Sequence, residues 1–319
     1  MSKLYADITG CTQPLQVNTT ASHSSQISTA SFEVVGTSLD IGDSLDIELG
    51  YVGNHGRVFS GYVKSIDRKE PSMTYQILAS DRLTRAAEYF IVSEDPKYPF
   101  SRSNILLEDL VSELLEMAGL SLDDHDDTNF SIGVSTNVEV NLTTTLDYCR
   151  YLGDIVTWCI YVDENDNICF KNRKPYVMDD DSSIGTLDST NATTSKASVD
   201  GNSLRNKIVI YGSAGVHAEA SEASPYLPAG FYRTVAINAA QLFVTQEMAQ
   251  MAADYNLEVL NRLTYSMSVV AIGNPDWLAR KVITANFPYI GVTNDDYYIF
   301  SSEHNWSEQG YTTNLELKR

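Results

Sequence analysis

Hydrophobic and polar residues alternate with a period of two over residues 31–92. Successive side chains of a strand point to opposite faces of a sheet, so this alternation is typical of half-buried β-strands. Turn signals at residues 42–43, 53–54 and 70–71 separate the runs. The alternating positions are Leu45, Ile47, Leu49, Tyr51, then Phe59, Gly61, Val63, then Tyr75, Ile77, Ala79. We expect an antiparallel meander that curls into a barrel-like module.

One hairpin pattern occurs twice, at residues 59–81 and again at residues 297–318. Each copy has a strand, a polar connection of similar length and a returning strand. On one face of the returning strands, the corresponding residues are Thr74, Gln76, Leu78 in the first copy and Thr312, Asn314, Glu316 in the second. Two copies of one β-module separated by unrelated sequence indicate internal pseudo-symmetry, which is typical of a building block.

Between the two copies the pattern becomes helical. Leucine, valine and methionine recur at three- and four-residue intervals over residues 103–119, and Ser103 or Asn104 is the expected N-cap, with Gly119 at the end. Residues 142–152 are expected to form a second helix. This helix leads through Gly153 into a hairpin of residues 156–162 and 168–171, with a polar turn at residues 163–167.

Further along, polar segments alternate with regular structure. Residues 177–200 and 212–228 are rich in small polar residues, so we expect loops there. Residues 206–211 predict a short buried strand. Residues 245–263 predict the longest helix, capped by Thr245, and strands follow from Tyr265 to the end of the chain.

These patterns together predict a β-rich α+β protein with two related antiparallel β-barrel-like modules, one at each end of the chain, and a helix-hairpin region between them. We expect the first module at residues 1–95, with an N-terminal arm at residues 1–30. The middle domain, with its acidic loops, is expected at residues 96–205. The second module, including the long helix, is expected at residues 206–319.

Composition and charge narrow the classes of function. The 319 residues, 43% of them hydrophobic, are enough to bury a sizeable core. The formal net charge is −20, from 22 basic and 42 acidic residues, and such a surface repels nucleic-acid phosphates. Sequence-specific DNA binding is therefore disfavoured, although a repelling surface suits a channel through which DNA slides. The sequence predicts no membrane-spanning segment and no signal peptide, and the four cysteines are read as reduced structural thiols.

The candidate chemical motifs are weak. Residues 163–167 resemble the start of a calcium loop, but an EF-hand needs glycine at its sixth position and glutamate at its twelfth, where this chain has Ile168 and Lys174. The acidic run at residues 123–127 is read as a solvated loop. The five histidines are scattered, and His304 is assigned a structural role. No nucleophile elbow or phosphate loop occurs. We therefore predict no catalytic residue, cofactor or metal.

Aromatic residues are plentiful, with 19 tyrosines in the chain. Tyrosine is common where proteins contact partners, because it buries a large area and keeps a polar tip. The predicted interface residues, all on the repeated hairpins, are Tyr62, Tyr75, Tyr297, Tyr298 and Tyr311.

A set of elements follows one another in a recognisable order along the chain: residues 41–47 (a glycine-aspartate turn into a strand), 59–63, 75–82, 146–170, 206–212, 249–262, 273–275 and 304–317. This order resembles the baseplate hub family of contractile-tailed phages, which includes the late control D proteins and the N-terminal part of the type VI secretion spike protein VgrG. Where that family has a glycine turn after Gly-Asn/Asp-Pro, this chain has Ala279-Arg280-Lys281.

The resemblance implies a non-enzymatic homotrimer in the virion tail, assembled in the host cytoplasm. It would join a six-fold tail tube to a three-fold spike and form part of the DNA channel, with a wedge protein as a further partner. One alternative is the tail-tip protein of a long flexible-tailed phage, which would contact a distal tail ring and a tape-measure protein. An alternative from another class is a carbohydrate-binding or glycan-cleaving β-protein.

Overall fold

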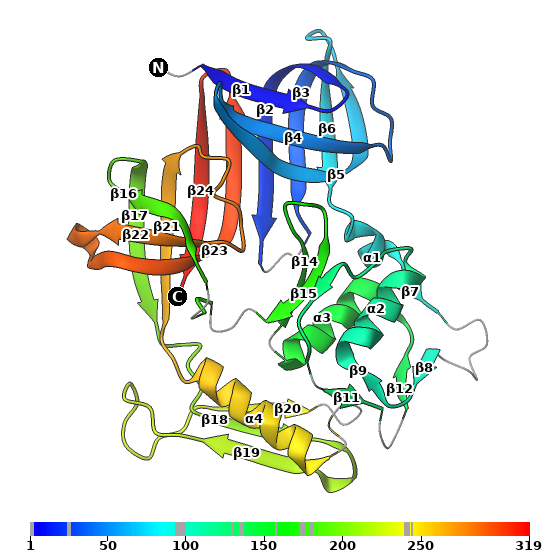
Figure 1. The fold of residues 1–319 in the computed structure, drawn as a ribbon, viewed down its shortest axis with the longest axis vertical. Coiled ribbons are helices and arrows are strands. Elements are labelled where there is room, and N and C mark those ends of the chain that lie inside the picture. The colour runs from blue at the N-terminus through cyan, green and yellow to red at the C-terminus, as the bar shows by residue number, and fades with distance from the viewer. Residues whose placement is uncertain are drawn as a thin grey trace.

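The computed structural model describes residues 3–23, 27–92, 100–128, 130–133, 137–156, 158–172, 176–178, 181–238, 243 and 245–319. Figure 1 shows two β-rich halves in the upper part of the molecule and the helices below them. The described chain is mostly β-structure, so the predicted β-rich class is confirmed.

The N-terminal half contains the predicted meander. β4, β5 and β6 pair antiparallel in sequence order, β3 lies beside β6, β2 beside β3, and β1 beside β4. The spatial order is therefore β1-β4-β5-β6-β3-β2. The strands are β1 (Leu4–Ile8), β2 (Cys11–Ser22), β3 (Thr29–Thr37), β4 (Ser44–Tyr51), β5 (Asn54–Lys69) and β6 (Thr74–Ser80).

The C-terminal half is built in the same way. β23 and β24 form the repeated hairpin, β22 pairs with β23, β21 with β24, β17 with β21, and β16 with β22. The strands are β16 (Ser183–Asp188), β17 (Ala192–Asp200), β21 (Thr264–Ile272), β22 (Val282–Phe287), β23 (Val292–Ser307) and β24 (Gly310–Lys318). A 3₁₀ turn, η2 (Pro288–Ile290), connects β22 to β23.

The two halves share one strand order. Within the described residues, the order β1-β4-β5-β6-β3-β2 in the first half corresponds strand for strand to β16-β22-β23-β24-β21-β17 in the second. The pairing differs only at the outer strand, since β1 runs antiparallel to β4 whereas β16 runs parallel to β22. The internal repeat is therefore six strands long, and the hairpin recognised in the sequence is its central part.

A β-bulge marks the same position in both hairpins. In the first, the register shifts between the pairs Val63–Ala79 and Ser65–Leu78. In the second, it shifts between Ile299–Leu317 and Ser301–Glu316. When the bulges are superposed, Gln76 corresponds to Asn314 and Leu78 to Glu316, which are the matches that the sequence pattern indicated. A bulge adds one residue to one strand and bends it, so a shared bulge is a specific geometric feature of the repeat.

The two halves are fused into one sheet. Residues 16–22 of β2 pair antiparallel with residues 301–307 of β23, and this pairing joins the halves. The described strands form a large, mainly antiparallel sheet and no closed barrel, so the expected barrel-like form of the two modules is not confirmed. Because β23 is long, β22 pairs with its first part while β2 pairs with its last part, along the same edge. The last part of this edge of β23, which β22 leaves unpaired, is therefore available to β2 of the first half.

Several segments form strands that the sequence did not predict, and those of the second repeat are polar edge strands. Residues 4–22, within the expected N-terminal arm, form β1 and β2. The segment expected as a loop at residues 177–200 contains β16 and β17, which begin the second repeat. The side chains of β17 are mostly exposed, small and polar, so the strand lacks the apolar alternation on which the prediction depended.

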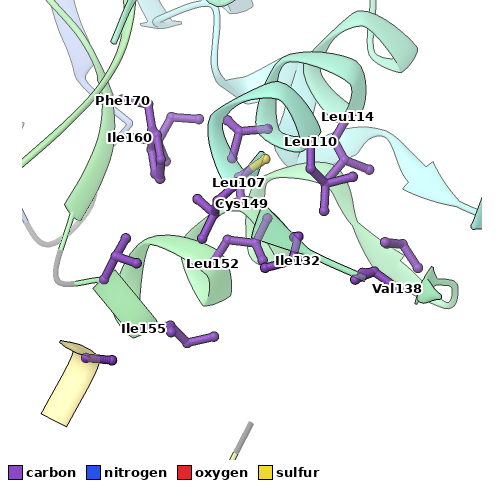
Figure 2. Close-up of a cluster of buried hydrophobic side chains, with 14 of the residues drawn as sticks. Leu107, Leu110, Leu114, Ile132, Val138, Cys149, Leu152, Ile155, Ile160 and Phe170 are labelled. Atoms are coloured by element: carbon purple, nitrogen blue, oxygen red, sulfur yellow. The ribbon is translucent and has the colours of Figure 1, made fainter. Parts of the chain in front are cut away.

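The helical part lies between the two repeats. α2 and α3 have strong apolar faces, and Figure 2 shows how Leu107, Leu110 and Leu114 of α2 face Cys149 and Leu152 of α3 in a buried cluster. The elements are α1 (Thr84–Glu88), β7 (Phe90–Ile91), β8 (Phe100–Arg102), β9 (Ile105–Leu106), α2 (Leu107–Met117), β10 (Asp124–His125), β11 (Ser131–Ile132), β12 (Val138–Val140), β13 (Thr143–Thr144), α3 (Thr145–Val156), β14 (Trp158–Val162) and β15 (Ile168–Asn172).

The predicted hairpin β14–β15 is confirmed, and both predicted helices are present with shifted bounds. Leu106, not Ser103 or Asn104, precedes the first turn of α2 and offers no side-chain cap, because the short strand β9 occupies the intervening residues. Gly119 follows the end of α2, as predicted. Its φ of +71° is left-handed, a conformation that glycine adopts at lower cost than any other residue.

A small unit is inserted between β17 and β21. It contains β18 (Lys207–Tyr211), the turn η1 (Ser213–Gly215), β19 (His217–Ser221), β20 (Thr234–Asn238) and α4 (Gln246–Leu260). The Thr245 hydroxyl caps α4 as predicted, accepting from the Met248 N–H at 3.2 Å. We expected α4 within the second β-module, but its buried residues Ala249, Ala252 and Ala253 join the core of α2 and α3. The segment expected as a loop at residues 212–228 includes β19.

Candidate functional site

A cleft of about 430 Å³ lies where three parts of the chain meet. Its wall is formed by β2 and β5 of the first half, by β23 and the segment before β22 of the second half, and by the hairpin β14–β15. Lys281 joins two of these parts through an ion pair of 2.6 Å with Glu164 in the hairpin turn. The cleft is therefore the junction that sets the position of the two repeats relative to the helical part.

Arg280 is the central residue of this cleft. It is 7% exposed, and its φ of +73° is left-handed, a conformation that favours glycine. The family resembled by the sequence has a glycine turn in this region, and Arg280 adopts the backbone conformation of such a glycine. Backbone strain of this kind persists only where the surroundings hold it in place.

The Arg280 guanidinium connects the parts of the junction. Its Nη2 donates to the Ser22 carbonyl of β2 at 2.9 Å, and the group lies 4.7 Å from the centre of the Tyr161 ring of β14. A longer contact of 3.5 Å joins Nη1 to the Val162 carbonyl. The buried Nε has no hydrogen-bond partner among the described residues. One side chain thus contacts the first half, the hairpin and its own second half.

Asp81 is the buried acid next to this arginine. It is 2% exposed and follows β6, where its carboxylate accepts from the Ser28 N–H at 2.5 Å and from the Leu83 N–H at 3.1 Å. Burial raises the pKa of Asp81 from 3.8 to about 6, although the backbone hydrogen bond from Ser28 and the charge of Arg280 act to lower it. The carboxylate therefore fixes the chain where β6 leads into α1.

A second buried polar group links β23 to β24. The His304 ring lies 3.0 Å from the Ser302 hydroxyl through Nε2 and 2.7 Å from the Tyr311 hydroxyl through Nδ1. The Ser302 hydroxyl donates to the Trp277 carbonyl at 2.6 Å, so it can accept from Nε2–H, which leaves Nδ1 to accept from Tyr311.

This Ser302–His304 pair is poorly suited to nucleophilic catalysis. Burial lowers the pKa of His304 from 6.5 to about 4, so the imidazole is a weak base at neutral pH. Its other nitrogen faces a tyrosine hydroxyl, and a catalytic triad has a carboxylate in that place. Both residues are almost fully buried in the sheet. The geometry supports the structural role predicted for His304.

The acidic segments stabilise the hairpin. Asp163 Oδ1 accepts from the N–H groups of Asn165 and Asn167 at 2.8 Å, which makes residues 163–167 the predicted turn. Asp123 Oδ2 accepts from the Ile168 N–H at 2.8 Å, and Asp124 pairs with Lys171 at 2.6 Å. The run at residues 123–127, expected as a solvated loop, is thus bonded to β15. The described residues contain no group of three or more side chains arranged to hold a metal ion.

The five predicted interface tyrosines do not lie on one surface. Tyr297, Tyr298 and Tyr311 are at most 3% exposed. Tyr297 and Tyr298 belong to hydrophobic clusters of the second half, whereas Tyr311 packs into the core of the first half. Tyr62 and Tyr75 are partly buried, and the guanidinium groups of Arg85 and Arg68 lie 4.9 and 5.7 Å from their ring centres, respectively. When the bulges of the two hairpins are superposed, Tyr62 corresponds to Tyr298. Tyr62 is partly exposed and Tyr298 is buried, so equivalent positions of the two repeats differ in exposure.

Comparison with known proteins places the chain in a family. A model of the YQBQ-like family matches residues 17–318. The chain belongs to the YQBQ-like family. A comparison with curated proteins gave no significant match.

Solved structures share the fold of this YQBQ-like protein. A tail protein from Neisseria meningitidis MC58 matches with a TM-score of 0.69 at 11% identity, over 99% of this chain and 97% of that one. The 43 kDa tail protein of prophage MuSo2 from Shewanella oneidensis matches with a TM-score of 0.68 at 12% identity, over 99% and 98%.

A third match is the E. coli c3393 protein, described as a component of the type VI secretion system with structural similarity to the T4 bacteriophage tail proteins gp27 and gp5. Its TM-score is 0.56 at 9% identity, over 98% of this chain and 76% of that one. At these identities the likeness establishes the fold, and that fold recurs in phage tail proteins. Among the described residues no helix has the length and apolar character needed to cross a membrane.

Sequence reasoning missed two residues of the cleft. In the sequence, Arg280 is visible only as a departure from a glycine turn, and Asp81 only as the end of a strand. The sequence indicates only that Arg280 is a charged residue where glycine is usual. The left-handed backbone and the burial of Arg280 are properties of the folded chain.

Proposed function

We propose that this protein is a non-enzymatic structural component of a phage tail, and that it is the hub of the baseplate. In this proposal three copies surround the tail axis, bind the six-fold tail tube on one side and a three-fold spike on the other, and enclose part of the DNA channel. A wedge protein would contact the outside of the trimer. The protein would be part of the virion after assembly in the host cytoplasm.

The observation that carries the proposal is the internal repeat. Each chain contains two six-stranded units with the same strand order and the same bulge. Three such chains around one axis present six related units, so a trimer can meet six equivalent partner surfaces and still match a three-fold spike. The fold shared with tail proteins supports this use of the repeat.

The fused sheet suits a component that must hold its partners in fixed positions. The pairing of β2 with β23 and the contacts of Arg280 hold the two repeats in a fixed relation. A tube-binding ring needs that fixed relation, because six surfaces must be presented at regular angles. The net charge of −20 would also keep a lumen formed by this protein from retaining DNA by phosphate contacts.

The experiment that tests the proposal is light scattering of the purified protein together with electron microscopy of the assembled particle. A trimer in solution and three copies at the tube–spike junction are expected. A protein that stays monomeric both in solution and in particles would refute the proposal, and hydrolysis of glycans by the purified protein would contradict its non-enzymatic part.

A further inference from the structure

Strand β17 forms an unpaired edge of the large sheet. It pairs with β21 on one side, and among the described strands none pairs with its other side. Figure 1 shows β17 beside β21, on the side of the second half that faces away from the first half. An unpaired edge presents backbone N–H and C=O groups to which a strand of another chain can bind. β17 thus offers a free edge nine residues long.

In the first half, the strand that corresponds to β17 is β2, and both of its sides are paired. Residues 16–22 of β2 pair with β23 on the side that is free in β17. The two strands also share a bulge, because the register with the adjacent strand shifts between Pro14 and Gln16 in β2 and between Ala192 and Thr194 in β17. The shared bulge aligns β17 with β2 residue by residue. The pairing of β2 with β23 therefore shows what an edge of this kind binds in this protein.

The strand that corresponds to β23 is β5, and the last part of β5 has a free edge. Residues 54–62 of β5 pair with β4, but residues 65–69 pair only with β6 among the described strands. In β23, the equivalent residues 301–305 pair with β24 on one side and with β2 on the other. Each chain thus has one edge on β17 and one complementary edge on β5 that its own described strands leave unpaired.

We propose that β17 of one copy pairs antiparallel with residues 65–69 of β5 in a second copy, as β2 pairs with β23 within each chain. The inference rests on the proposed trimer and adds the strands that hold the copies together. In a ring of three chains, three pairings within chains and three between chains then join six repeats. Once the ring is closed, neither β17 nor the end of β5 is left unpaired in any copy.

The pairing within the chain also sets the register between copies. Equivalent residues follow from the shared bulges and from the pairing of each strand with its neighbours. The pairs expected between β17 of one copy and β5 of the next are Asp200–Ser65, Val199–Ile66, Ser198–Asp67, Ala197–Arg68 and Lys196–Lys69. Lys69 is already ion-paired with Glu33 at 3.0 Å, so its charge is partly compensated where it faces Lys196.

The apolar pair in this register is Val199 with Ile66. Val199 is 59% exposed on a strand whose other exposed side chains are polar. It lies on the same face as Ala197, which packs against the core of the second half. Ile66 is partly buried and packs against the core of the first half. Side chains directly opposite each other on antiparallel strands stabilise a sheet, so the pairing would cover the one large apolar side chain that β17 exposes.

The charge complementarity between copies follows from a hydrogen bond within the chain. Asn18 Nδ2 of β2 donates to Glu303 Oε1 of β23 at 2.7 Å. The equivalent residues are Lys196 in β17 and Asp67 in β5, and both are exposed with no ion-pair partner among the described residues. Between copies, the same geometry brings the Lys196 ammonium to the Asp67 carboxylate. An amide–carboxylate contact within the chain is thus replaced by an ion pair between chains, which favours a second copy as the partner of β17.

The first test is a pair of cysteines, Val199→Cys and Ile66→Cys, in one full-length chain. Directly opposite positions on paired strands bring the Cβ atoms close enough for a disulfide. We expect mild oxidation to join the copies into a covalent trimer on a non-reducing denaturing gel. The matched control combines Val199→Cys with Val52→Cys, which alters a valine of similar exposure, 60%, in the turn between β4 and β5 and should give no such product.

The second test measures association directly. Val199→Asp should raise the protein concentration at which the trimer dissociates by about tenfold or more in a light-scattering dilution series, because it places a carboxylate against Ile66 and next to Asp67. Val52→Asp makes the same change at a similarly exposed valine and should leave that concentration unchanged. An unchanged circular dichroism spectrum of both variants would show that the fold is intact.

The outcomes separate this inference from the proposed function. If the wild-type chain is a trimer but residues 66 and 199 of different copies do not cross-link, or the control pair cross-links equally, the strand pairing is overturned and the trimeric hub stands. A trimer that Val199→Asp does not weaken has the same consequence. If Val199→Asp does not fold, the cysteine pair decides alone, and it is oxidised in assembled particles if the trimer forms only there. A wild-type chain that is monomeric both in solution and in particles would overturn both proposals.

Discussion

Arg280 offers the sharpest test of how the two repeats are held together. Its backbone is left-handed, with a φ of +73°, and its buried guanidinium contacts the first half and the hairpin. Arg280→Ala removes the guanidinium and keeps the backbone strain, because alanine disfavours this conformation as arginine does. Arg280→Gly removes both, because glycine adopts it freely. The pair of variants therefore separates the side-chain contribution from the backbone cost.

The magnitudes follow from the contacts of the guanidinium. The hydrogen bond from the charged group to the Ser22 carbonyl contributes about 1.5–3 kcal/mol. The position over the Tyr161 ring contributes roughly 2 kcal/mol in a desolvated site. The desolvation cost of the buried cation offsets part of this gain, so we expect Arg280→Ala to lower the free energy of unfolding by about 3 kcal/mol. Arg280→Gly should lower it by about 1 kcal/mol less, since the left-handed strain is relieved.

The assay is denaturant unfolding of both variants and the wild-type protein, followed by fluorescence and circular dichroism. Equal stability of Arg280→Gly and the wild-type protein would refute the claim that the guanidinium stabilises the junction. Equal stability of the two variants would refute the claim that the backbone is strained at this position.

Three further predictions concern buried groups of the sheet. The pKa of Asp81 is raised from 3.8 to about 6, so the stability that this shift contributes is complete below pH 3.8 and is lost as the pH rises through about 6. In denaturant titrations between pH 4 and 7, the wild-type protein should therefore lose about 3 kcal/mol of unfolding free energy relative to Asp81→Asn. A flat difference between the two proteins would contradict this. The pKa of His304 is lowered from 6.5 to about 4, so the pH dependence of its contribution to stability has the opposite sign. Relative to His304→Asn, the wild-type protein should lose stability as the pH falls from 6.5 towards 4. A stability difference between the two proteins that does not change with pH would show that the imidazole is not desolvated. Gly273→Ala should lower the free energy of unfolding by about 1–3 kcal/mol or more, because a Cβ there would lie 2.2 Å from the Tyr311 ring, and an unchanged melting temperature would contradict that close packing.

The parts of the fold predicted from sequence are those with a strong hydrophobic period. The meander of β4, β5 and β6 alternates and the capped helix α4 repeats, because one face of each is buried. In the hairpin β14–β15 consecutive residues are buried, and the two short apolar runs on either side of a polar turn predicted it. The repeated hairpin was recognised from matching positions such as Gln76 and Asn314, and the shared bulge supports that alignment.

The parts that were not predicted depend on contacts between distant segments. β16 and β17 are polar edge strands, and their place in the sheet is set by pairing with β22 and β21. The fusion through β2 and β23 is a pairing between the two ends of the chain, which no local pattern encodes. The burial of Tyr297, Tyr298 and Tyr311 likewise depends on what packs over them, and aromatic content alone does not encode it.

In the proposed hub, a duplicated six-stranded unit allows three chains to bind six partners. The most direct measurement is an electron-microscopy reconstruction of the assembled tail without imposed symmetry at this position. We expect three copies of the chain, with the two repeats of each copy at alternate positions of a ring facing six equivalent tube subunits. Six copies of the chain, or a ring in which only one repeat of each copy faces the tube, would contradict it.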